Sequence, residues 1–282
     1  MTSIAESLKK VASALAASGV AESGREAVSL MMLATRRDRT FIYAHPDQLL
    51  ATEEIQLLDS LLQRRAHREP LQYISGVQEF FGLEFEVTPD VLIPRPETEI
   101  VVEQAIGFLQ SRASREFCDV GVGSGCISVS ILHHVSGSSA VGTDISEAAL
   151  RVANRNAERH QVTERLSLVE SDVFGSLGDR QFDMIVSNPP YIPISDMGGL
   201  QAEVRDFEPH NALTDGADGL SIIRRIISDA PRFLHPQGAL LMEIGVEQSV
   251  SVVKMFGAGR WRTPTLYPDL QAIPRLIFTE LI

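Results

Sequence analysis

The chain has 282 residues, a length that predicts about two domains at roughly 150 residues each. Its hydrophobic content of 44% and charged content of 22% are typical of a globular protein and exclude a fibrous or disordered chain. A formal net charge of -12 argues against a broad phosphate-binding surface, because nucleic-acid affinity depends largely on Lys and Arg.

The first residues, MTSIAESLKK, lack the layout of a signal peptide, and no apolar run reaches the ~18 residues that span a bilayer. We therefore expect a cytoplasmic protein with no membrane partner. Cys118 and Cys126 show neither CxxC spacing nor a neighbouring pair of histidines. We expect no disulfide framework and no metal site, and interpret both cysteines as small core residues.

Residues 1–70 are predicted to form a small helical bundle. Apolar residues recur at helical spacing in the first segment, where Ser3 and Glu6 match a capping box. Further helical patterns follow, one of them after a predicted cap at Thr52. The apolar stripes are interpreted as core packing. A basic run, interpreted as a solvated helix face, consists of Arg64, Arg65, His67 and Arg68.

Residues 71–96 are rich in aromatic and β-branched residues, Gly and Pro, which predicts a β-hairpin linker. Pro94 and Pro96 stiffen its end, and a helix is predicted to begin at Glu97. From residue 97 to 282, apolar runs alternate with helical stretches. This pattern predicts an α/β fold with a Rossmann-like sheet, mostly parallel and doubly wound, with helices on both faces. The runs are FCDVGVG, SAVGTDI, LSLVESD, FDMIVSN and GALLMEIG, and RLIFTELI adds a last strand.

A glycine-rich loop follows the first of these strands and precedes a helix, an arrangement that lets backbone approach a ligand closely. Its spacing is GxGxG, and Cys126 stands where a dinucleotide fingerprint requires a third glycine. The spacing therefore counts against a nicotinamide-dependent oxidoreductase. We predict that a nucleoside-containing cofactor binds at Gly121, Val122, Gly123, Ser124 and Gly125.

Acidic residues follow the next two strands. Asp144 is predicted to accept hydrogen bonds from the ribose hydroxyls of the cofactor. Asp172 is predicted to accept from the adenine amine, with Val173 and Phe174 covering the adenine faces. On the local sequence alone, an Asp172 that caps a turn beside core residues is a nearly equal alternative.

The fourth strand ends in Asn188, Pro189, Pro190 and Tyr191, at the edge where open α/β sheets bind ligands. Methylation of a planar nitrogen requires two acceptors that hold the NH2 group with its lone pair toward the methyl group. Asn188 offers its side-chain carbonyl and Pro189 its backbone carbonyl. Because these acceptors bind more strongly as the nitrogen becomes cationic, we predict that the segment is catalytic. Tyr191 is predicted to bound the pocket as a flat surface against the substrate.

The same acceptors suit an exocyclic base amine, so an adenine or cytosine amino-methyltransferase acting on RNA or DNA is the alternative enzyme. The acidity of the chain counts against it. A non-catalytic nucleotide-binding adaptor is a third interpretation, which leaves the NPPY segment without a purpose.

Over nearly its whole length the chain resembles the release-factor glutamine methyltransferases. The resemblance lies in DVGVGSGC and SNPPY, together with EPLQYISG and VLIPRPETE. It implies methyl transfer from S-adenosyl-L-methionine, with S-adenosyl-L-homocysteine as product, to the glutamine of the Gly-Gly-Gln motif in peptide chain release factors. It also implies these release factors as partners, no direct nucleic-acid binding, and an N-terminal helical domain that docks the substrate.

The resemblance also implies roles for single residues. It places the cofactor at Gly121 to Gly125, Asp144 and Val173, beside Asn188, and the substrate glutamine at Asn188 to Tyr191. The family commonly has an aromatic residue where this chain has Val173, and Phe174 is the expected substitute.

Two further stretches resemble the family: EPHNALTDGADGL, from Glu208 to Leu220, and MEIGVEQ, which contains Glu243 and Gln248. Glu208 and Asp218 are interpreted as contacts that order a loop. Arg95 and Glu97 are interpreted as an interdomain tie or, equally, a substrate contact.

Overall fold

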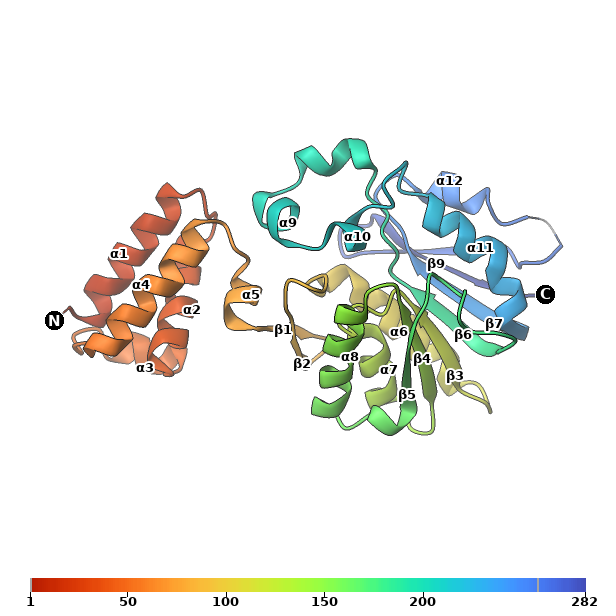
Figure 1. Cartoon of the computed structure of the whole chain (residues 1–282), viewed down its shortest axis with the longest axis horizontal. Coiled ribbons are helices and arrows are strands. Elements are labelled where there is room, and N and C mark those ends of the chain that lie inside the picture. Colours follow the sequence, from red (N-terminus) through yellow and green to blue (C-terminus); the bar gives the residue numbers. More distant parts are fainter. Residues whose placement is uncertain (1, 258) are drawn as a thin grey trace. The chain divides into compact units, whose positions relative to one another are not determined.

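The computed structural model describes residues 2–257 and 259–282, and it divides into two compact units. Unit 1 comprises Met1–Gly76 and Gln201–Phe207, and unit 2 comprises Val77–Leu200 and Glu208–Ile282 (Figure 1). In the described ranges, none of the helices combines the length and the apolar character that crossing a bilayer requires.

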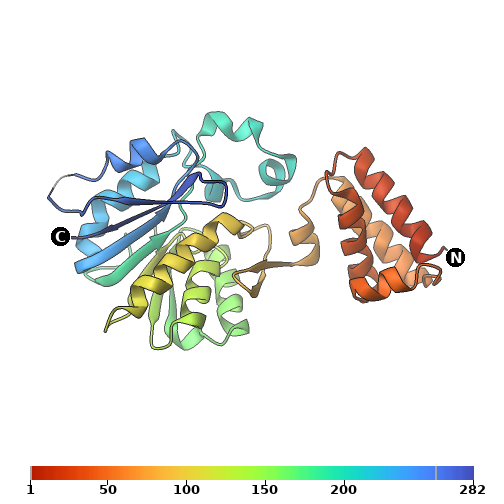
Figure 2. The same ribbon diagram turned by 180° about the vertical axis from the view of Figure 1, so that it is seen from behind.

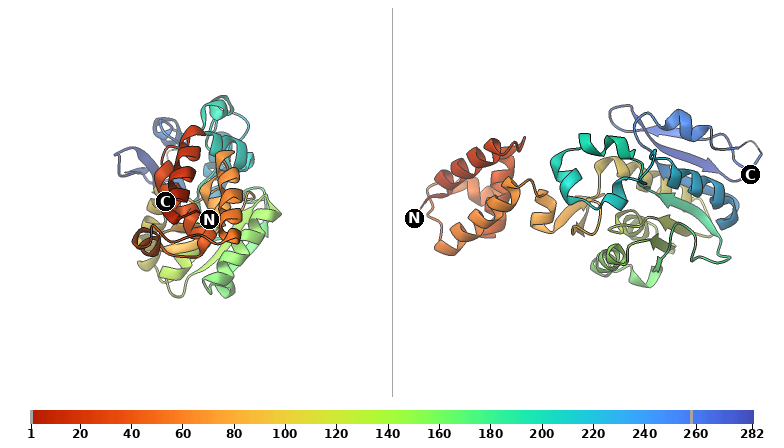
Figure 3. Two further views of the ribbon diagram at one scale, coloured as in Figure 1. Left: turned by 90° about the vertical axis from the view of Figure 1, so that its left-hand side faces the viewer. Right: turned by 45° about the horizontal axis from the view of Figure 1, so that its top comes forward.

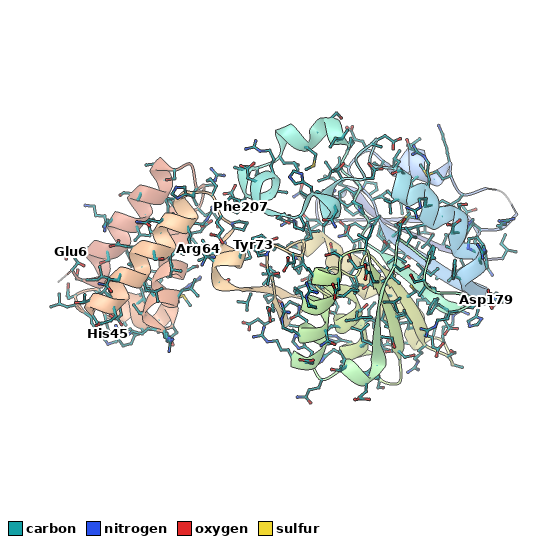
Figure 4. All side chains as sticks on the ribbon, in the orientation of Figure 1. Glu6, His45, Arg64, Tyr73, Asp179 and Phe207 are labelled. Atoms are coloured by element: carbon teal, nitrogen blue, oxygen red, sulfur yellow. The ribbon has the colours of Figure 1, made fainter. Side chains whose placement is uncertain are left out.

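Unit 1 is a helical bundle, as predicted, and its core is a cluster of apolar side chains that includes Ile4, Leu15 and Met31. The expected capping box is present, because the Glu6 N–H donates to Ser3 Oγ and the Ser3 N–H donates to the Glu6 carboxylate. Figure 4 labels Glu6 among the side chains of the bundle. Its helices are α1 (Ile4–Ala17), α2 (Ser23–Thr35), α3 (Arg39–Ala44), α4 (Thr52–Ala66), α5 (Leu71–Ser75) and α9 (Ala202–Phe207).

The cap of α4 differs from the prediction by one residue. Helix α4 begins at Thr52 itself, and Ala51 stands in the cap position. Alanine has no side-chain acceptor, so the Glu54 carboxylate closes the first turn by accepting from the Ala51 N–H at 2.8 Å.

The basic run at the end of α4 is a second correction, because its central arginine is not solvated. Arg65 is 5% exposed, and its guanidinium donates to Glu26 on α2 and to Glu203 on α9. Arg68 binds the same Glu203 carboxylate at 2.6 Å. Burying an arginine requires such paired carboxylates, so these side chains hold α2, α4 and α9 together within unit 1.

Unit 2 begins with the predicted hairpin, which is shorter than the predicted linker. Strands β1 (Val77–Phe80) and β2 (Leu83–Glu86) pair antiparallel, whereas residues 71–75 form helix α5. Buried Phe80 and Phe85 join the hairpin to the core of unit 2.

In the described part of unit 2, the main sheet has seven strands in the order β5-β4-β3-β6-β7-β9-β8. Strands β3 to β7 run parallel, which confirms the predicted mostly parallel sheet, and β9 and β8 complete one edge in antiparallel pairings. The short strand β8 was not predicted. The strands are β3 (Glu116–Val120), β4 (Ser139–Asp144), β5 (Leu166–Glu170), β6 (Phe182–Ser187), β7 (Leu234–Glu243), β8 (Thr265–Pro268) and β9 (Pro274–Glu280).

Helices cover both faces of the sheet, as predicted (Figures 2 and 3). Alternate residues of one strand therefore enter different cores: Phe117 packs under α6, α7 and α8, whereas Cys118 packs under α11 and α12. The helical elements of unit 2 are η1 (Pro96–Thr98), α6 (Glu99–Gln110), α7 (Cys126–His134), α8 (Glu147–Arg159), η2 (Thr163–Arg165), η3 (Ile194–Gly199), α10 (His210–Leu213), α11 (Ser221–Phe233) and α12 (Ser249–Val253).

The strand order reverses between β3 and β6. In an open α/β sheet, the crevice beyond the carboxyl ends of the strands at such a reversal is where ligands bind. The glycine-rich loop follows β3 and the NPPY segment follows β6, so the fold brings both predicted motifs to this point.

Candidate functional site

A cavity of about 350 Å³ lies at this edge of the sheet, and all the residues that line it belong to unit 2. Its volume falls within the range of roughly 300–1,000 Å³ that is usual for small-molecule sites. The cavity brings together most of the predicted site residues: Gly121, Val122, Gly123, Ser124, Asp144, Asp172, Val173, Asn188, Pro189 and Pro190.

Gly125 is the member of the glycine-rich loop that does not line the cavity. It adopts a φ of +80°, and a Cβ at this position would lie 3.2 Å from the Cβ of Ala153 on α8. A glycine is therefore required both for the left-handed backbone and for the close packing of α7 against α8. Gly125 therefore sets the backbone conformation of the loop and packs against α8 instead of facing the cavity.

Asp144 links the glycine-rich loop to the start of α8. Its two carboxylate oxygens accept the N–H groups of Gly123 at 3.0 Å and Ser146 at 2.9 Å. Each oxygen has a second lone pair, which leaves capacity for ligand hydroxyls. Burial raises the pKa of Asp144, and the hydrogen bonds from Ser146 and Gly123 oppose that shift.

The segment after β5 only partly matches its predicted role. Asp172 lines the cavity, while its carboxylate pairs with Arg225 at 2.9 Å. Val173 also lines the cavity and has a φ of 56°, a left-handed conformation that a β-branched residue rarely adopts. Such strain is concentrated at binding sites, which supports a functional role for this turn.

Phe174 is a correction. It is 4% exposed, it is not among the residues that line the cavity, and its ring stacks on Phe233 with 4.6 Å between the ring centroids. The turn at Val173 directs this side chain into the core beneath α11, so Phe174 does not substitute for an aromatic residue at the cavity.

Asn188 follows β6, and its half-buried side chain lines the cavity. Its Nδ2 donates to Oγ1 of Thr98 at 3.1 Å. Because the amide nitrogen is used in this way, the carbonyl oxygen Oδ1 is left as an acceptor for another group. Pro189 and Pro190 line the same wall of the cavity, next to the amide.

Tyr191 lies elsewhere than predicted, because it is not among the residues that line the cavity. Its hydroxyl donates to Glu243 at 3.0 Å, and its backbone carbonyl accepts from Gln248 at 2.8 Å. A Cβ at Gly219 would lie 2.2 Å from the same carbonyl oxygen. Burial raises the pKa of Tyr191, and the charge of Glu243 raises it further. Tyr191 therefore anchors the NPPY segment from behind and remains a protonated donor.

Arg95 lines the cavity and pairs with Glu208 at 2.6 Å. Glu208 is buried and also accepts from the Ile93 N–H, so it joins the linker to the segment that follows residue 207. Burial raises the pKa of Glu208, and the charge of Arg95 opposes this. Both residues belong to unit 2, so the ion pair is not the interdomain tie that was one interpretation of Arg95.

Asp218 makes an exposed pair with Arg224 and accepts from the Leu220 N–H. Glu208 and Asp218 thus both order loop segments, as interpreted from the sequence.

Sequence reasoning missed Asp215, whose carboxylate accepts N–H groups from Ala217, Gly219 and Ser221 at the rim of the cavity. Burial would raise the pKa of Asp215, but these hydrogen bonds and the Ser221 hydroxyl lower it to about 2. The signal for this turn is the repeated Asp and Gly in TDGADGL, a pattern typical of side-chain-capped turns.

Thr98 was also missed as a site residue, and Glu243 was placed in a family-like stretch without a role. Thr98 lines the cavity, and Glu243 lies behind it with 1% of its surface exposed. A glutamate at the end of the apolar run ALLMEIG is the available sequence signal, because a buried carboxylate requires partners.

The two cysteines differ from each other. Cys118 is fully buried in the core, as predicted, whereas Cys126 is partly exposed, begins α7 and lines the cavity. Burial raises the pKa of Cys126 to about 12, so its thiol stays protonated and is not a nucleophile. Within residues 2–257 and 259–282, no group of three His, Cys, Asp or Glu side chains is arranged to hold a metal ion.

Comparison with protein families matches both parts of the chain. Residues 6–76 match the PrmC N-terminal domain, and residues 100–198 match the methyltransferase small domain. A solved structure, a methyltransferase from Pyrococcus furiosus, superposes with a TM-score of 0.54 at 17% identity. That match covers 77% of this chain and 98% of the other, and it shows a shared fold.

Curated relatives are more similar in sequence. The release factor glutamine methyltransferase of Geobacter sulfurreducens is 46% identical over 86% of this chain and 84% of its own length. The release factor glutamine methyltransferase of Cereibacter sphaeroides is 38% identical over 98% of each chain. At this identity and coverage, the chain belongs to the release factor glutamine methyltransferase family.

Proposed function

We propose that this chain transfers a methyl group from S-adenosyl-L-methionine to the side-chain amide nitrogen of a release-factor glutamine. The glutamine is that of the Gly-Gly-Gln motif in peptide chain release factors, and its methylation supports translation termination. The observation that carries the proposal is Asn188, whose amide lines the cavity with Nδ2 engaged by Thr98 and Oδ1 left to accept from an NH2 group. The names of the relatives support the same substrate.

The residues at the cavity fit S-adenosylmethionine. Asp144 is a mostly buried carboxylate with unused lone pairs for ribose hydroxyls, and Gly121 to Ser124 place backbone against the same space. Asp172 and Val173 border the region where the base would lie. When bound, this cofactor supplies the electrophilic methyl group.

The catalytic task of the chain is to hold a poor nucleophile. The lone pair of an amide nitrogen is delocalised, so the NH2 group has to be turned until the lone pair faces the methyl group. Asn188 Oδ1 and the Pro189 carbonyl accept its two hydrogens, and both bonds strengthen as the nitrogen becomes cationic. The cationic nitrogen is strongly acidic and releases its proton to water, so no strong base is required.

The bundle of unit 1 is proposed as a second contact surface for the release factor. A single glutamine side chain offers too little contact for selectivity, and additional binding energy would orient it at the methyl group. Deleting residues 1–70 would test this poorly, since it also leaves Glu203 without Arg65 and Arg68. Replacing the exposed Tyr43, Leu49 and Leu57 with Ser should raise the KM for release factor and leave cofactor affinity unchanged. An unchanged KM would contradict docking through these side chains.

The proposed function is tested by incubating the full chain and labelled S-adenosylmethionine with a purified release factor, with RNA and with DNA. One methyl group should appear on the glutamine of the Gly-Gly-Gln motif, as located by mass spectrometry. A release factor with that glutamine replaced should stay unlabelled. Strong labelling of RNA or DNA, with none on release factors, would establish the amino-methyltransferase alternative.

A further inference from the structure

Three polar residues from distant segments form a chain of hydrogen bonds that runs from the cavity wall, at Asn188 and Thr98, to the buried Glu243. Asn188 Nδ2 donates to Thr98 Oγ1 at 3.1 Å, and Thr98 Oγ1 donates to Glu243 Oε2 at 2.6 Å. Thr98 is 2% exposed and Glu243 is 1% exposed, so the bond between them is buried, whereas the bond from the half-buried Asn188 lies at the cavity wall. In a buried setting, exchanging a donor for an acceptor is costly because water does not satisfy the unpaired group.

The direction of each bond follows from the chemistry of the far end. An ionised carboxylate only accepts, so the single proton of the Thr98 hydroxyl points to Glu243. The Thr98 oxygen is then only an acceptor toward Asn188, so the Asn188 side chain must donate to it through its NH2 group. Its Oδ1 is consequently directed to the substrate side. A flipped amide would set oxygen against oxygen at Thr98 and would offer a donor to the substrate NH2 group.

We infer that Thr98 and Glu243 are positioning residues for methyl transfer, which together set the orientation of the Asn188 amide. This inference rests on the proposed function and deepens it by explaining why the acceptor faces the reacting nitrogen. Glu243 also accepts from the Tyr191 hydroxyl through its other oxygen, Oε1, at 3.0 Å. One carboxylate thus binds the last residue of the NPPY segment, Tyr191, directly and the first residue, Asn188, through Thr98.

The hydrogen-bond geometry around Glu243 supports its ionised state. Burial raises the pKa of Glu243, and the charge of Glu97 raises it further, whereas hydrogen bonds from Thr98 and Tyr191 and the charge of Arg275 oppose the shift. Both oxygens have a donor in place, so the carboxylate is satisfied without a proton of its own.

Single-turnover methyl transfer to a release factor tests the inference with Thr98→Val, which keeps the shape of the side chain and removes the hydroxyl. We expect the rate at saturating cofactor to fall about 10–100-fold, by analogy with the loss of the hydrogen-bond partner that orients a metal ligand. The dissociation constant for S-adenosylmethionine should change little. Thr98→Ser restores a hydroxyl and should regain most of the rate.

Thr279→Val is the matched control for the loss of a buried hydroxyl. Thr279 is 1% exposed on β9, and its hydroxyl donates to the Arg262 carbonyl. Both Val variants should stay folded, and Thr98→Val should lose more thermal stability because it removes a donor from the buried Glu243 carboxylate. Thr279→Val should keep the wild-type rate. Equal rate losses in the two variants would assign Thr98 a purely structural role and overturn the inference.

A double-mutant cycle separates positioning from direct contact. Once Asn188 is replaced by Ala, Thr98 has no amide left to orient, so Asn188→Ala/Thr98→Val should be as slow as Asn188→Ala alone. A further full loss in the double variant would show that Thr98 acts independently of Asn188, contrary to the inference.

A measurement without substrate keeps the inference separate from the proposed function. In the protein labelled with ¹⁵N-asparagine, the Asn188 side-chain NH2 signal, identified by its loss in Asn188→Ala, should be protected from exchange with water. Protection should disappear in Thr98→Val and return in Thr98→Ser. Unchanged protection in Thr98→Val would overturn the inference that Thr98 orients the Asn188 amide, even if methyl transfer is observed. If the wild type does not methylate release factors, the proposed function fails, and the exchange of this signal still tests whether Thr98 orients the amide.

Discussion

At one end of the cavity, which we name the cofactor end, the ligand-facing groups come from one loop, Gly121 to Ser124, and from the acid Asp144. At the other end, the transfer end, Asn188 depends on Thr98 and Glu243, which lie far away in the chain. The cofactor end works largely through backbone geometry, and its acid is bonded to backbone N–H groups. The transfer end works through side chains, in which each hydrogen bond sets the orientation of the next side chain.

This difference implies that the two ends fail in different ways when they are altered. A substitution at the cofactor end removes ground-state contacts, so it should weaken cofactor binding. A higher cofactor concentration should then restore the rate of methyl transfer. Damage at the transfer end removes an interaction that strengthens in the transition state, so a higher concentration of ligand should not restore the rate.

The largest expected effect comes from Asn188→Ala at the transfer end. Methyl transfer should slow by roughly 10²–10³-fold, the range seen when a preorganised polar stabiliser is removed. Cofactor affinity, measured by calorimetry, should stay near that of the wild type. A near-normal single-turnover rate in this variant would remove Asn188 from the mechanism.

Asp144→Ala probes the cofactor end. Two ribose hydroxyls would lose their acceptor, so binding of S-adenosylmethionine should weaken by about 1.5–3 kcal/mol. Calorimetry with the cofactor alone measures this, and circular dichroism checks that the fold is intact. An unchanged dissociation constant would place the ribose elsewhere.

Asp119 tests how much a buried carboxyl group beside the glycine-rich loop reduces the stability of the folded protein. Asp119 lies fully buried on β3, directly before the glycine-rich loop, and its Oδ2 accepts from Ser128 on α7. Its Oδ1 has no partner among the described residues. Burial raises the pKa of Asp119 from 3.8 to about 7, despite the bonds from Ser128.

Between these two pKa values the folded state holds a proton that the unfolded state has released. The stabilisation is therefore complete below about pH 4 and is lost as the pH rises toward 7. Asp119→Asn does not ionise, so its unfolding free energy should rise relative to that of the wild type by about 2.7 kcal/mol between pH 5 and pH 8, at about 1.36 kcal/mol for each pH unit below the raised pKa. Melting temperatures of both proteins across this pH range measure the change. A gap that does not change with pH would show that Asp119 keeps an ordinary pKa.

The smallest effects concern the two ion pairs that order loops near the transfer end. Glu208→Ala leaves the partly buried Arg95 without its partner and should cost about 1–2 kcal/mol of stability. Asp218→Ala breaks the exposed pair with Arg224 and should leave the melting temperature unchanged. Equal losses in the two variants would contradict the difference in burial on which this prediction rests.

The sequence predicted best what depends on neighbouring residues. The capping box of Ser3 and Glu6 and the glycine-rich loop are local patterns in which spacing determines backbone geometry, so both were found. The sheet followed from alternating apolar runs, because each run has to be buried between helices. The order and direction of β8 and β9 depend on tertiary pairing and were not predicted.

Side-chain direction and long-range partners were beyond the sequence. Phe174 was assigned to the cavity, but the positive φ of Val173 turns it into the core. Arg65 was assigned to solvent. Its partner Glu203 is distant in the sequence and comes close to it only in the folded unit 1, so the pair was not predicted. Tyr191 was assigned to the pocket wall for the same reason, since its partner Glu243 comes from β7.

The most direct test of the two-ended site is the rate of single-turnover methyl transfer at saturating S-adenosylmethionine in Asp144→Ala and Asn188→Ala. Our account predicts that Asp144→Ala recovers nearly the wild-type rate, whereas Asn188→Ala stays roughly 10²–10³-fold slower. If saturating cofactor restored both variants, or if both stayed equally slow, the division of the cavity into a cofactor end and a transfer end would be contradicted.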